Sequence, residues 1–258
     1  MTTSTTSRAS GRRFRDKFVV EERHLPRATR RRLFATAAAL ILLGAVFFTG
    51  LLVGVLTHTG FERFDRPVEL WFNEQRSGGM TGVMAFLAVV FGPVGMPIIV
   101  LVVTVVWLVA AKHAWRPLVL AVGMATGVVL AQVLAPIVRH PRPPIGLMLV
   151  GPDHSFSFPS GHVLGVCDFF LITAFLLASR VQSRRFAIGA FVVAIAMILI
   201  QMASRLYLGY HWISDTTASL TLSMMILGVV IAVDTARTTL EPGEPVTGPH
   251  SQPQQDGT

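Results

Sequence analysis

The chain carries very little charge for its length. Only 14% of its 258 residues are Asp, Glu, Lys or Arg, against about a quarter in ordinary soluble domains. Cysteine is nearly missing as well, and the single Cys167 cannot form an internal disulfide or a cysteine-based zinc site. The few charges gather before residue 33 and between residues 62 and 76. These absences exclude an ordinary soluble globule and a disulfide-stabilised scaffold.

Long apolar runs fill the remainder of the chain. Uncharged stretches cover 33–57, 77–111, 117–138, 186–203 and 216–233, each near or above the roughly 18–20 residues that span hydrocarbon. Glycine and proline at positions 92–97 interrupt the longest run, because both residues break helices. We therefore predict an all-α polytopic membrane protein, a six-transmembrane-helix bundle with a short interfacial helix near 80–91. The spans are expected at 33–57, 94–111, 117–138, 162–179, 186–203 and 212–234.

Basic residues indicate the orientation of these spans. Ten of the 22 Lys and Arg residues precede residue 33, next to the first membrane helix, as the positive-inside rule expects of a cytoplasmic segment. This placement accounts for the net charge of +8 without a nucleic-acid partner. The basic loops at 112–116 and 180–185 should lie on the same side. The segments 58–80, 139–161 and 204–211 consequently face the extracytoplasmic side.

The domain organisation follows from the same pattern. Residues 1–32 form a basic cytoplasmic tail and residues 235–258, rich in Pro, Gly, Gln and Thr, a second cytoplasmic tail, both expected to be disordered. The apolar run 33–57 is about twice the length of a signal-peptide core, so it is predicted to be a retained first span. The transmembrane domain covers 33–234. Paired glycines four residues apart favour helix packing within one chain, so no oligomeric state is inferred.

The first polar constellation is the segment Arg139-His140-Pro141-Arg142-Pro143-Pro144 at the outer end of span three. Its prolines end the helix and hold the chain extended. One interpretation is a helix stop with arginines that reach to the interface. The other is an anion clamp, because a guanidinium matches phosphate with two parallel donors.

The second constellation is Pro159-Ser160-Gly161-His162, which leads directly into span four. Ser160 suits a helix N-cap, and Gly161 leaves its backbone N–H open to close approach. A helix start of this kind favours an anion. A capping motif alone does not need His162, which lies where it could donate a proton to a leaving oxygen.

The third constellation comprises Ser204-Arg205, then His211, then Asp215. If span six begins near residue 210, His211 and Asp215 lie four residues apart on one helical face, and the carboxylate can accept a hydrogen bond from the imidazole. That pairing leaves the other ring nitrogen free as a nucleophile or base. The bland alternative is a buried hydrogen bond, but an ionisable pair at the membrane interface favours function.

Together these three segments resemble the signature motifs of the type 2 phosphatidic acid phosphatase superfamily of integral membrane lipid phosphatases. The resemblance covers about residues 80–234 and implies that His211 attacks phosphorus to give a phosphohistidine, that Asp215 orients it, and that His162 protonates the leaving oxygen. It further implies a set of phosphate ligands: Arg142, Arg205, Ser160 and Gly161. Neither a metal nor another cofactor is implied.

One position departs from the family pattern. A lysine usually stands seven residues before the motif arginine, and here Ala135 occupies that position. Arg139, one helical turn further along, is our hypothetical replacement for the missing charge. We also expect Asp168 to make an interior hydrogen bond within span four. A metal cluster of His140, His154 and His162 is the disfavoured alternative for the other histidines, because their spacings match no metal-binding pattern.

The sequence thus predicts an integral membrane phosphatase that removes phosphate from a lipid mono- or diphosphate whose tail stays in the bilayer. A polyprenyl diphosphate is the favoured substrate, with phosphatidic acid and phosphatidylglycerol phosphate as the other candidates. Two alternatives stay open. A second lipid or a sugar could accept the phosphoryl group in place of water, or the protein could bind or transport lipid phosphates without turnover.

Overall fold

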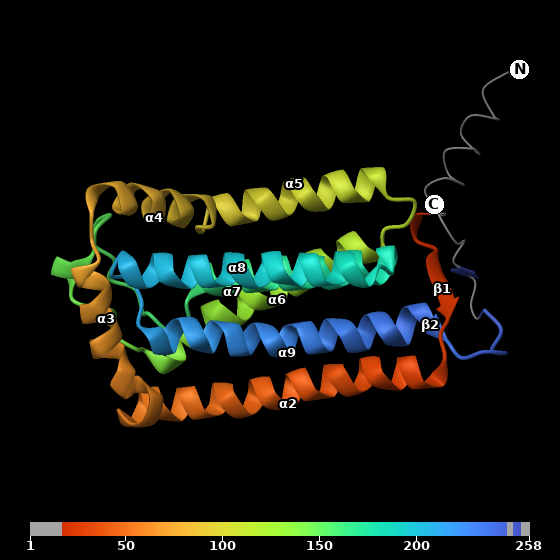
Figure 1. The fold of residues 1–258 in the computed structure, drawn as a ribbon, viewed down its shortest axis with the longest axis horizontal. Coiled ribbons are helices and arrows are strands. Elements are labelled where there is room, and N and C mark those ends of the chain that lie inside the picture. The colour runs from red at the N-terminus through yellow and green to blue at the C-terminus, as the bar shows by residue number, and fades with distance from the viewer. Residues whose placement is uncertain (1–16, 247–249, 254–258) are drawn as a thin grey trace, which may run out of the picture.

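The computed structural model describes residues 17–246 and 250–253. The helices are α2 (Arg27–Thr57), α3 (Asp65–Glu74), α4 (Gly78–Val90), α5 (Gly95–Ala110), α6 (Trp115–Val138), α7 (Gly161–Val181), α8 (Arg184–Tyr207) and α9 (Ile213–Thr238). The long helices run side by side along the longest axis of the molecule, and α3 crosses one end of the bundle (Figure 1). The prediction of an all-α polytopic membrane bundle is confirmed.

The membrane spans agree with the apolar runs, with one refinement. Five helices, α2, α6, α7, α8 and α9, are long and apolar enough to cross a membrane. Helices α4 and α5 meet at an angle of 53°, and they make a sixth span if the bent pair crosses the membrane as one unit. At the bend, a Cβ on Gly92 would lie 2.5 Å from the carbonyl oxygen of Ala88, so only glycine fits there. The predicted interfacial helix near 80–91 is therefore the first half of a bent pair, because α5 alone has 16 residues.

Helices α7 and α9 form the centre of the bundle. In α7 and α9, 50% and 61% of the apolar window is buried, whereas the windows of α2, α6 and α8 are each 22% buried. Gly123 and Gly127 of α6 pack on α7, since a Cβ there would meet Ile172 or the Asp168 carboxylate. Asp168 itself is 1% exposed and accepts a hydrogen bond from Ser223 of α9 at 2.5 Å. Asp168 is thus an interior hydrogen-bonding residue, as hypothesised.

A small sheet closes the end of the bundle opposite α3. Strands β1 (Val20–His24), β2 (Thr239–Leu240) and β3 (Ser251–Pro253) pair in parallel in the order β2-β1-β3. The expectation of disordered tails is wrong for these residues. Helix α2 begins at Arg27, α9 continues to Thr238, and buried Glu22 of β1 pairs with Arg237 of α9 at 2.8 Å. The remaining tail residues, 1–16, 247–249 and 254–258, lie outside the described residues.

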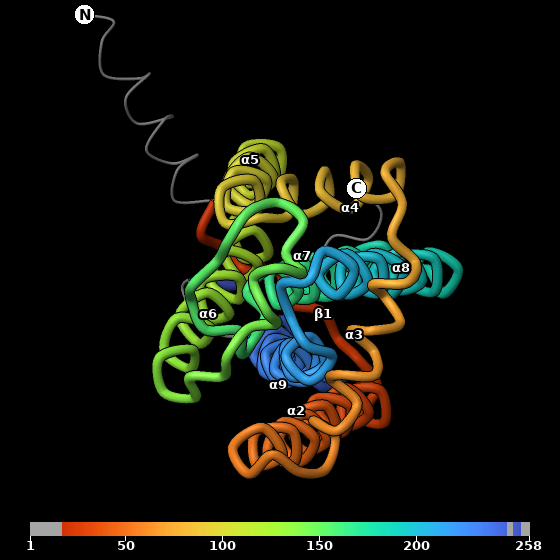
Figure 2. Tube along the Cα trace, turned by 90° about the vertical axis from the view of Figure 1, so that its left-hand side faces the viewer, coloured from red at the N-terminus to blue at the C-terminus, as the bar shows by residue number. Residues whose placement is uncertain are grey.

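The segments that carry the three constellations gather at the α3 end. The end-on view shows the connections α2–α4, α6–α7 and α8–α9 crossing the same end of the bundle (Figure 2). This grouping matches the expected grouping of 58–80, 139–161 and 204–211. The tight connection after α8 requires glycine at position 209. The backbone there has φ +77°, and any Cβ would collide with the carbonyl oxygen of Leu147. The fold therefore brings residues far apart in sequence to one place.

Candidate active site

His211 and Arg142 lie in direct contact at this end of the bundle. Nη1 of Arg142 is 3.2 Å from Nε2 of His211 and donates to the carbonyl oxygen of Tyr210 at 2.7 Å. The second constellation reaches the third through α9: Ser219 Oγ donates to the carbonyl oxygen of Ser160 at 2.9 Å. All three predicted constellations thus contribute to one site.

His211 does not occupy a helical face with Asp215, contrary to the expectation. Helix α9 begins at Ile213, so His211 lies in the preceding loop. Its Nδ1 donates to the carbonyl oxygen of Ser157 at 2.9 Å and lies 3.4 Å from Oδ2 of Asp215. Because Nδ1 carries the proton in this arrangement, Nε2 presents a free lone pair, which accepts from Arg142. The nitrogen predicted to be the nucleophile therefore faces Arg142.

Burial sets the protonation of His211. The side chain is 3% exposed. Burial lowers the pKa of His211 to about 4, and the hydrogen bond from His211 to Asp215 only partly opposes this, while Arg205 and Arg142 lower the pKa further. The imidazole is consequently neutral near pH 7, as an attacking nitrogen must be.

Asp215 is fully buried and accepts hydrogen bonds from several neighbours. Its Oδ2 accepts from the backbone N–H of Trp212 at 2.9 Å and faces His211. Its Oδ1 accepts from Nδ1 of His140 at 2.8 Å and from Ser157 Oγ at 3.3 Å. The sequence predicted the first partnership but not the sharing with His140.

Arg142 is held from several sides. Its Nε and Nη2 donate to the carbonyl oxygen and Oγ of Ser155 at 3.0 and 2.9 Å, and Nη2 lies 3.0 Å from Oδ2 of Asp153. Burial would raise the pKa of Asp153, but hydrogen bonds from Ser155 and the charge of Arg142 hold it below its ordinary value. Asp153 therefore stays ionised and occupies the guanidinium edge that would face a phosphate.

We expect Asp153→Asn to lower KM for a lipid phosphate about two- to five-fold with kcat unchanged, because an anion no longer competes for Arg142. The backbone carbonyls of Ser155 and Tyr210 still orient the guanidinium. Steady-state kinetics in mixed micelles would measure this, with Ser155→Ala, which removes a neutral hydroxyl, as the matched control. A higher KM in Asp153→Asn would contradict the expectation and make Asp153 an orienting partner of Arg142.

Arg205 and Ser160 have buried polar groups that lack partners. Arg205 is 4% exposed, its guanidinium lies 4.7 Å from the ring centre of Tyr210, and it makes no hydrogen bond or ion pair within residues 17–246 and 250–253. Ser160 occupies the N-cap position of α7 but makes no capping bond, and its buried Oγ is likewise without a partner there. Space around the Cα of Gly161 is open. Unsatisfied buried donors of this kind favour a bound anion.

His162 links this site to an apolar cavity. The imidazole hydrogen-bonds the backbone of Ala88 at the end of α4 and lies near the bend at Gly92. A cavity of about 480 Å³ begins at Gly161 and His162 and continues between α5, α6 and α7. Leu101 and Val128 line it and are 63% and 53% exposed, so the cavity opens on the outer surface of the bundle.

The structure does not bring Arg139 to the other predicted phosphate ligands. It follows α6 with φ 55°, its side chain is exposed, and its Nε donates to the carbonyl oxygen of Pro136 at 2.9 Å. We therefore expect Arg139→Ala to keep kcat and KM within about two-fold of the unmodified protein. A rise in KM comparable to that of Arg142→Ala would instead support Arg139 as the replacement for the lysine absent at Ala135.

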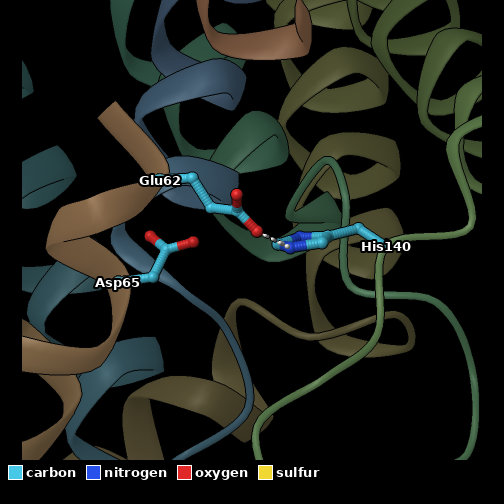
Figure 3. Close-up of side chains that lie close together, drawn as sticks. All are labelled: Glu62, Asp65 and His140. Atoms are coloured by element: carbon cyan, nitrogen blue, oxygen red, sulfur yellow. Dashed lines mark ion pairs between the residues drawn. The ribbon is translucent and has the colours of Figure 1, made fainter. Parts of the chain in front are cut away.

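The proposed histidine metal cluster does not form among the described residues. The group that comes close enough there to suit a metal ion comprises Glu62, Asp65 and His140, with donor atoms within 4.8 Å of one another (Figure 3). His154 is exposed, and it is not a member of that group. Both oxygens of Asp65 already accept hydrogen bonds from Ser214, at 2.9 and 2.7 Å. Burial, partly opposed by those bonds, raises the pKa of Asp65 to about 6.

The fold and the site define a polytopic helical membrane protein in which arginines and histidines gather at one end of the bundle. A sequence profile described as the PAP2 superfamily matches residues 116–239. The chain is similar to this superfamily over these residues, and the resemblance indicated by the three motifs is confirmed.

Known relatives agree in sequence and in fold. Phosphatidylglycerophosphatase B of Bacillus subtilis (strain 168) is 24% identical over 167 residues, which cover 64% of this chain and 76% of that protein. The crystal structure of a transmembrane PAP2-type phosphatidylglycerolphosphate phosphatase from Bacillus subtilis superposes with a TM-score of 0.68 at 20% identity, covering 78% of this chain and 96% of that one. Aquifex aeolicus LpxE gives a TM-score of 0.52 at 20% identity, covering 66% and 95%.

Proposed function

We propose that the protein is a membrane lipid phosphatase that hydrolyses the phosphate of a lipid mono- or diphosphate through a phosphohistidine intermediate. The observation that carries this proposal is Arg205, which is 4% exposed and whose buried Nε has no acceptor, beside a neutral His211 whose Nε2 faces Arg142. A buried cation is stable only with a compensating anion. A phosphoryl group would supply that anion and place phosphorus next to the nucleophile.

The apolar cavity favours a lipid over a soluble phosphate. Its wall is mostly aliphatic, and it leads from the exposed surface of α5 and α6 to His162. A hydrocarbon chain in it would gain about 0.8 kcal/mol for each buried CH₂, and its headgroup would lie at the α7 start. Polyprenyl diphosphate is the substrate that we favour, and phosphatidylglycerol phosphate is supported by the names of the Bacillus relatives.

The proposed chemistry is a double displacement on phosphorus. The Nε2 lone pair of His211 attacks phosphorus, the bond to the leaving oxygen breaks, and His162 donates a proton to that oxygen. Water then attacks the phosphohistidine, with His162 accepting its proton, and His211 is regenerated with release of inorganic phosphate. Arg142, Arg205, Ser160 and the backbone N–H of Gly161 hold the phosphoryl oxygens.

The orientation of the site is also part of the proposal. Basic residues Arg184 and Arg185 begin α8 at the sheet end of the bundle, which supports a cytoplasmic location for that end and for both termini. The site would then face the extracytoplasmic side.

A phosphate-release assay tests the function. Purified protein in detergent would be incubated with polyprenyl diphosphate, phosphatidylglycerol phosphate, phosphatidic acid and the soluble ester glycerol 3-phosphate, with His211→Ala as the blank. We expect release from at least one lipid and little from the soluble ester. Phosphate transfer to an added lipid or sugar without release would favour a phosphotransferase. Binding without either reaction would favour the non-catalytic binder or transporter.

The pH profile of kcat/KM should have an acid limb set by His211, because this imidazole must be neutral to attack phosphorus. With the pKa of His211 lowered to about 4, the nucleophile stays neutral as pH falls through 6.5 and is lost only near pH 4. We therefore expect the acid limb below pH 5. Assays from pH 4 to 9, with preincubated samples returned to pH 7 to exclude denaturation, would measure it. An acid limb at 6.5 or above would contradict the assignment.

A further inference from the structure

We infer that His140 is a positioning residue of the reaction. It is the buried cationic partner of Asp215, and it shares the carboxylate of Asp215 with the nucleophile His211. This inference rests on the proposed function for its role in turnover. Nδ1 of His140 lies 2.8 Å from Oδ1 of Asp215, and the two side chains are 4% and 0% exposed. Oδ2 faces His211 at 3.4 Å. The two histidines thus occupy the two oxygens of one carboxylate.

Charge balance requires a cation at this place. Asp215 is fully buried, and its other donors, the backbone N–H of Trp212 and the hydroxyl of Ser157, are neutral. His211 is neutral as well, because burial lowers its pKa. A buried carboxylate without a cationic partner is costly, and His140 is the cationic side chain in hydrogen-bond contact with Asp215 within the described residues.

The surroundings of His140 favour its doubly protonated form. Nε2 faces Oε1 of Glu62 at 3.7 Å, and the Asp65 carboxylate lies nearby (Figure 3). Burial would lower the pKa of His140, but Asp215, Asp65 and Glu62 together raise it above its ordinary value. With a proton on each nitrogen, the ring joins Asp215 to Glu62.

The same contacts argue against a metal ion in this cluster. Asp65 uses both oxygens to accept from Ser214, and Oε1 of Glu62 also contacts Nδ1 of His58 at 2.9 Å. These groups therefore already have donors of their own. An imidazolium satisfies the remaining oxygens without further ligands.

His140 should act on His211 through charge. The groups that face His140 are Asp215 from α9 and Glu62 and Asp65 from the segment after α2, with His58 beside Glu62. The charged and titratable groups around His211 are Asp215, Arg142, Arg205, Asp153 and His162. A positive His140 offsets part of the Asp215 charge and so keeps the His211 imidazole neutral. Without that positive charge, Asp215 would attract a proton to His211 more strongly.

The supporting residues come from outside the segment that matches the superfamily. Glu62 and Asp65 precede the matched residues 116–239, whereas His140, His211 and Asp215 lie inside it. The connection between α2 and α4 therefore contributes charged groups to the network around His211.

The test compares His140→Asn, which keeps a neutral donor toward Asp215, with Glu62→Gln, which leaves Asp215 untouched. The pKa of His211 would be read in two ways: from the acid limb of kcat/KM, and from NMR titration of ¹³Cε1-histidine protein in detergent, with the signal assigned by its loss in His211→Ala. We expect a rise of about one unit in His140→Asn, equal to a ten-fold change in proton affinity, and a smaller rise in Glu62→Gln.

The outcomes separate the inference from the proposed function. An unmoved His211 titration in both variants would overturn the role of His140, even if kcat fell, because a merely structural residue does not shift that titration. The NMR reading applies whether or not the protein releases phosphate. Loss of wild-type activity in excess chelator, with recovery on adding Zn²⁺, would replace the ion-pair network by a metal site and also overturn the inference.

Discussion

Purified His211→Ala protein is expected to release phosphate from its lipid substrate at least a thousand-fold more slowly than the unmodified protein. The substitution removes the Nε2 lone pair that faces Arg142, and no phosphohistidine can form without it. Losing a nucleophile in a covalent mechanism costs on the order of 10³-fold or more in kcat.

The control for this variant is His154→Ala, an exposed histidine at the same end of the bundle. Its activity should remain within about two-fold of the unmodified protein. Phosphate release would be followed by single-turnover kinetics, and the phosphohistidine by acid-labile ³²P label on the protein. If His211→Ala turns over lipid at the unmodified rate, the nucleophile has been wrongly assigned.

Arg205→Ala should reduce kcat/KM by about 10²- to 10³-fold, the range seen when a donor to a developing oxyanion is removed. The guanidinium is buried against the ring of Tyr210 and is not engaged by another residue of the described chain. Its contact with the phosphoryl oxygens would therefore be its main interaction.

Arg205→Lys should recover only part of the loss, because an ammonium group cannot reproduce the two parallel donors of a guanidinium. Arg185→Ala, an exposed arginine at the sheet end, is the matched control and should leave both constants unchanged. Inhibition by inorganic phosphate provides a reading of binding alone. An Arg205→Ala protein with unchanged kcat/KM would remove Arg205 from the phosphate ligands.

The apolar runs predicted most of the architecture, because hydrocarbon permits few backbone solutions and every span needs a long uncharged helix. The bend between α4 and α5 was visible as a glycine and proline interruption, but its role as a broken span depends on tertiary packing. The short strands β1 to β3 carry no comparable pattern. They depend on pairs such as Glu22 with Arg237, which join residues more than 200 positions apart.

The predicted site residues other than Arg139 lie at the α3 end of the bundle. The charged segments and the helix start at Ser160 had predicted that they would lie together. The supporting contacts were not predictable in the same way. The contact from His211 to the carbonyl oxygen of Ser157 involves the backbone and leaves no signature in residue type. Glu62 stood out only as one charge in a polar connection. Asp153 was not predicted as a site residue, although its side chain accepts from the N–H of Ser155 two residues on, a short-range turn typical of aspartate.

The lateral opening of the cavity between α5, α6 and α7 has a kinetic consequence. A substrate that enters through the wall of the bundle is delivered by two-dimensional diffusion within the lipid leaflet. The reaction rate then does not depend on the bulk molar concentration of the substrate. Initial rates should follow the mole fraction of lipid phosphate in the micelle or vesicle surface, and dilution with inert detergent at fixed total substrate should slow the reaction.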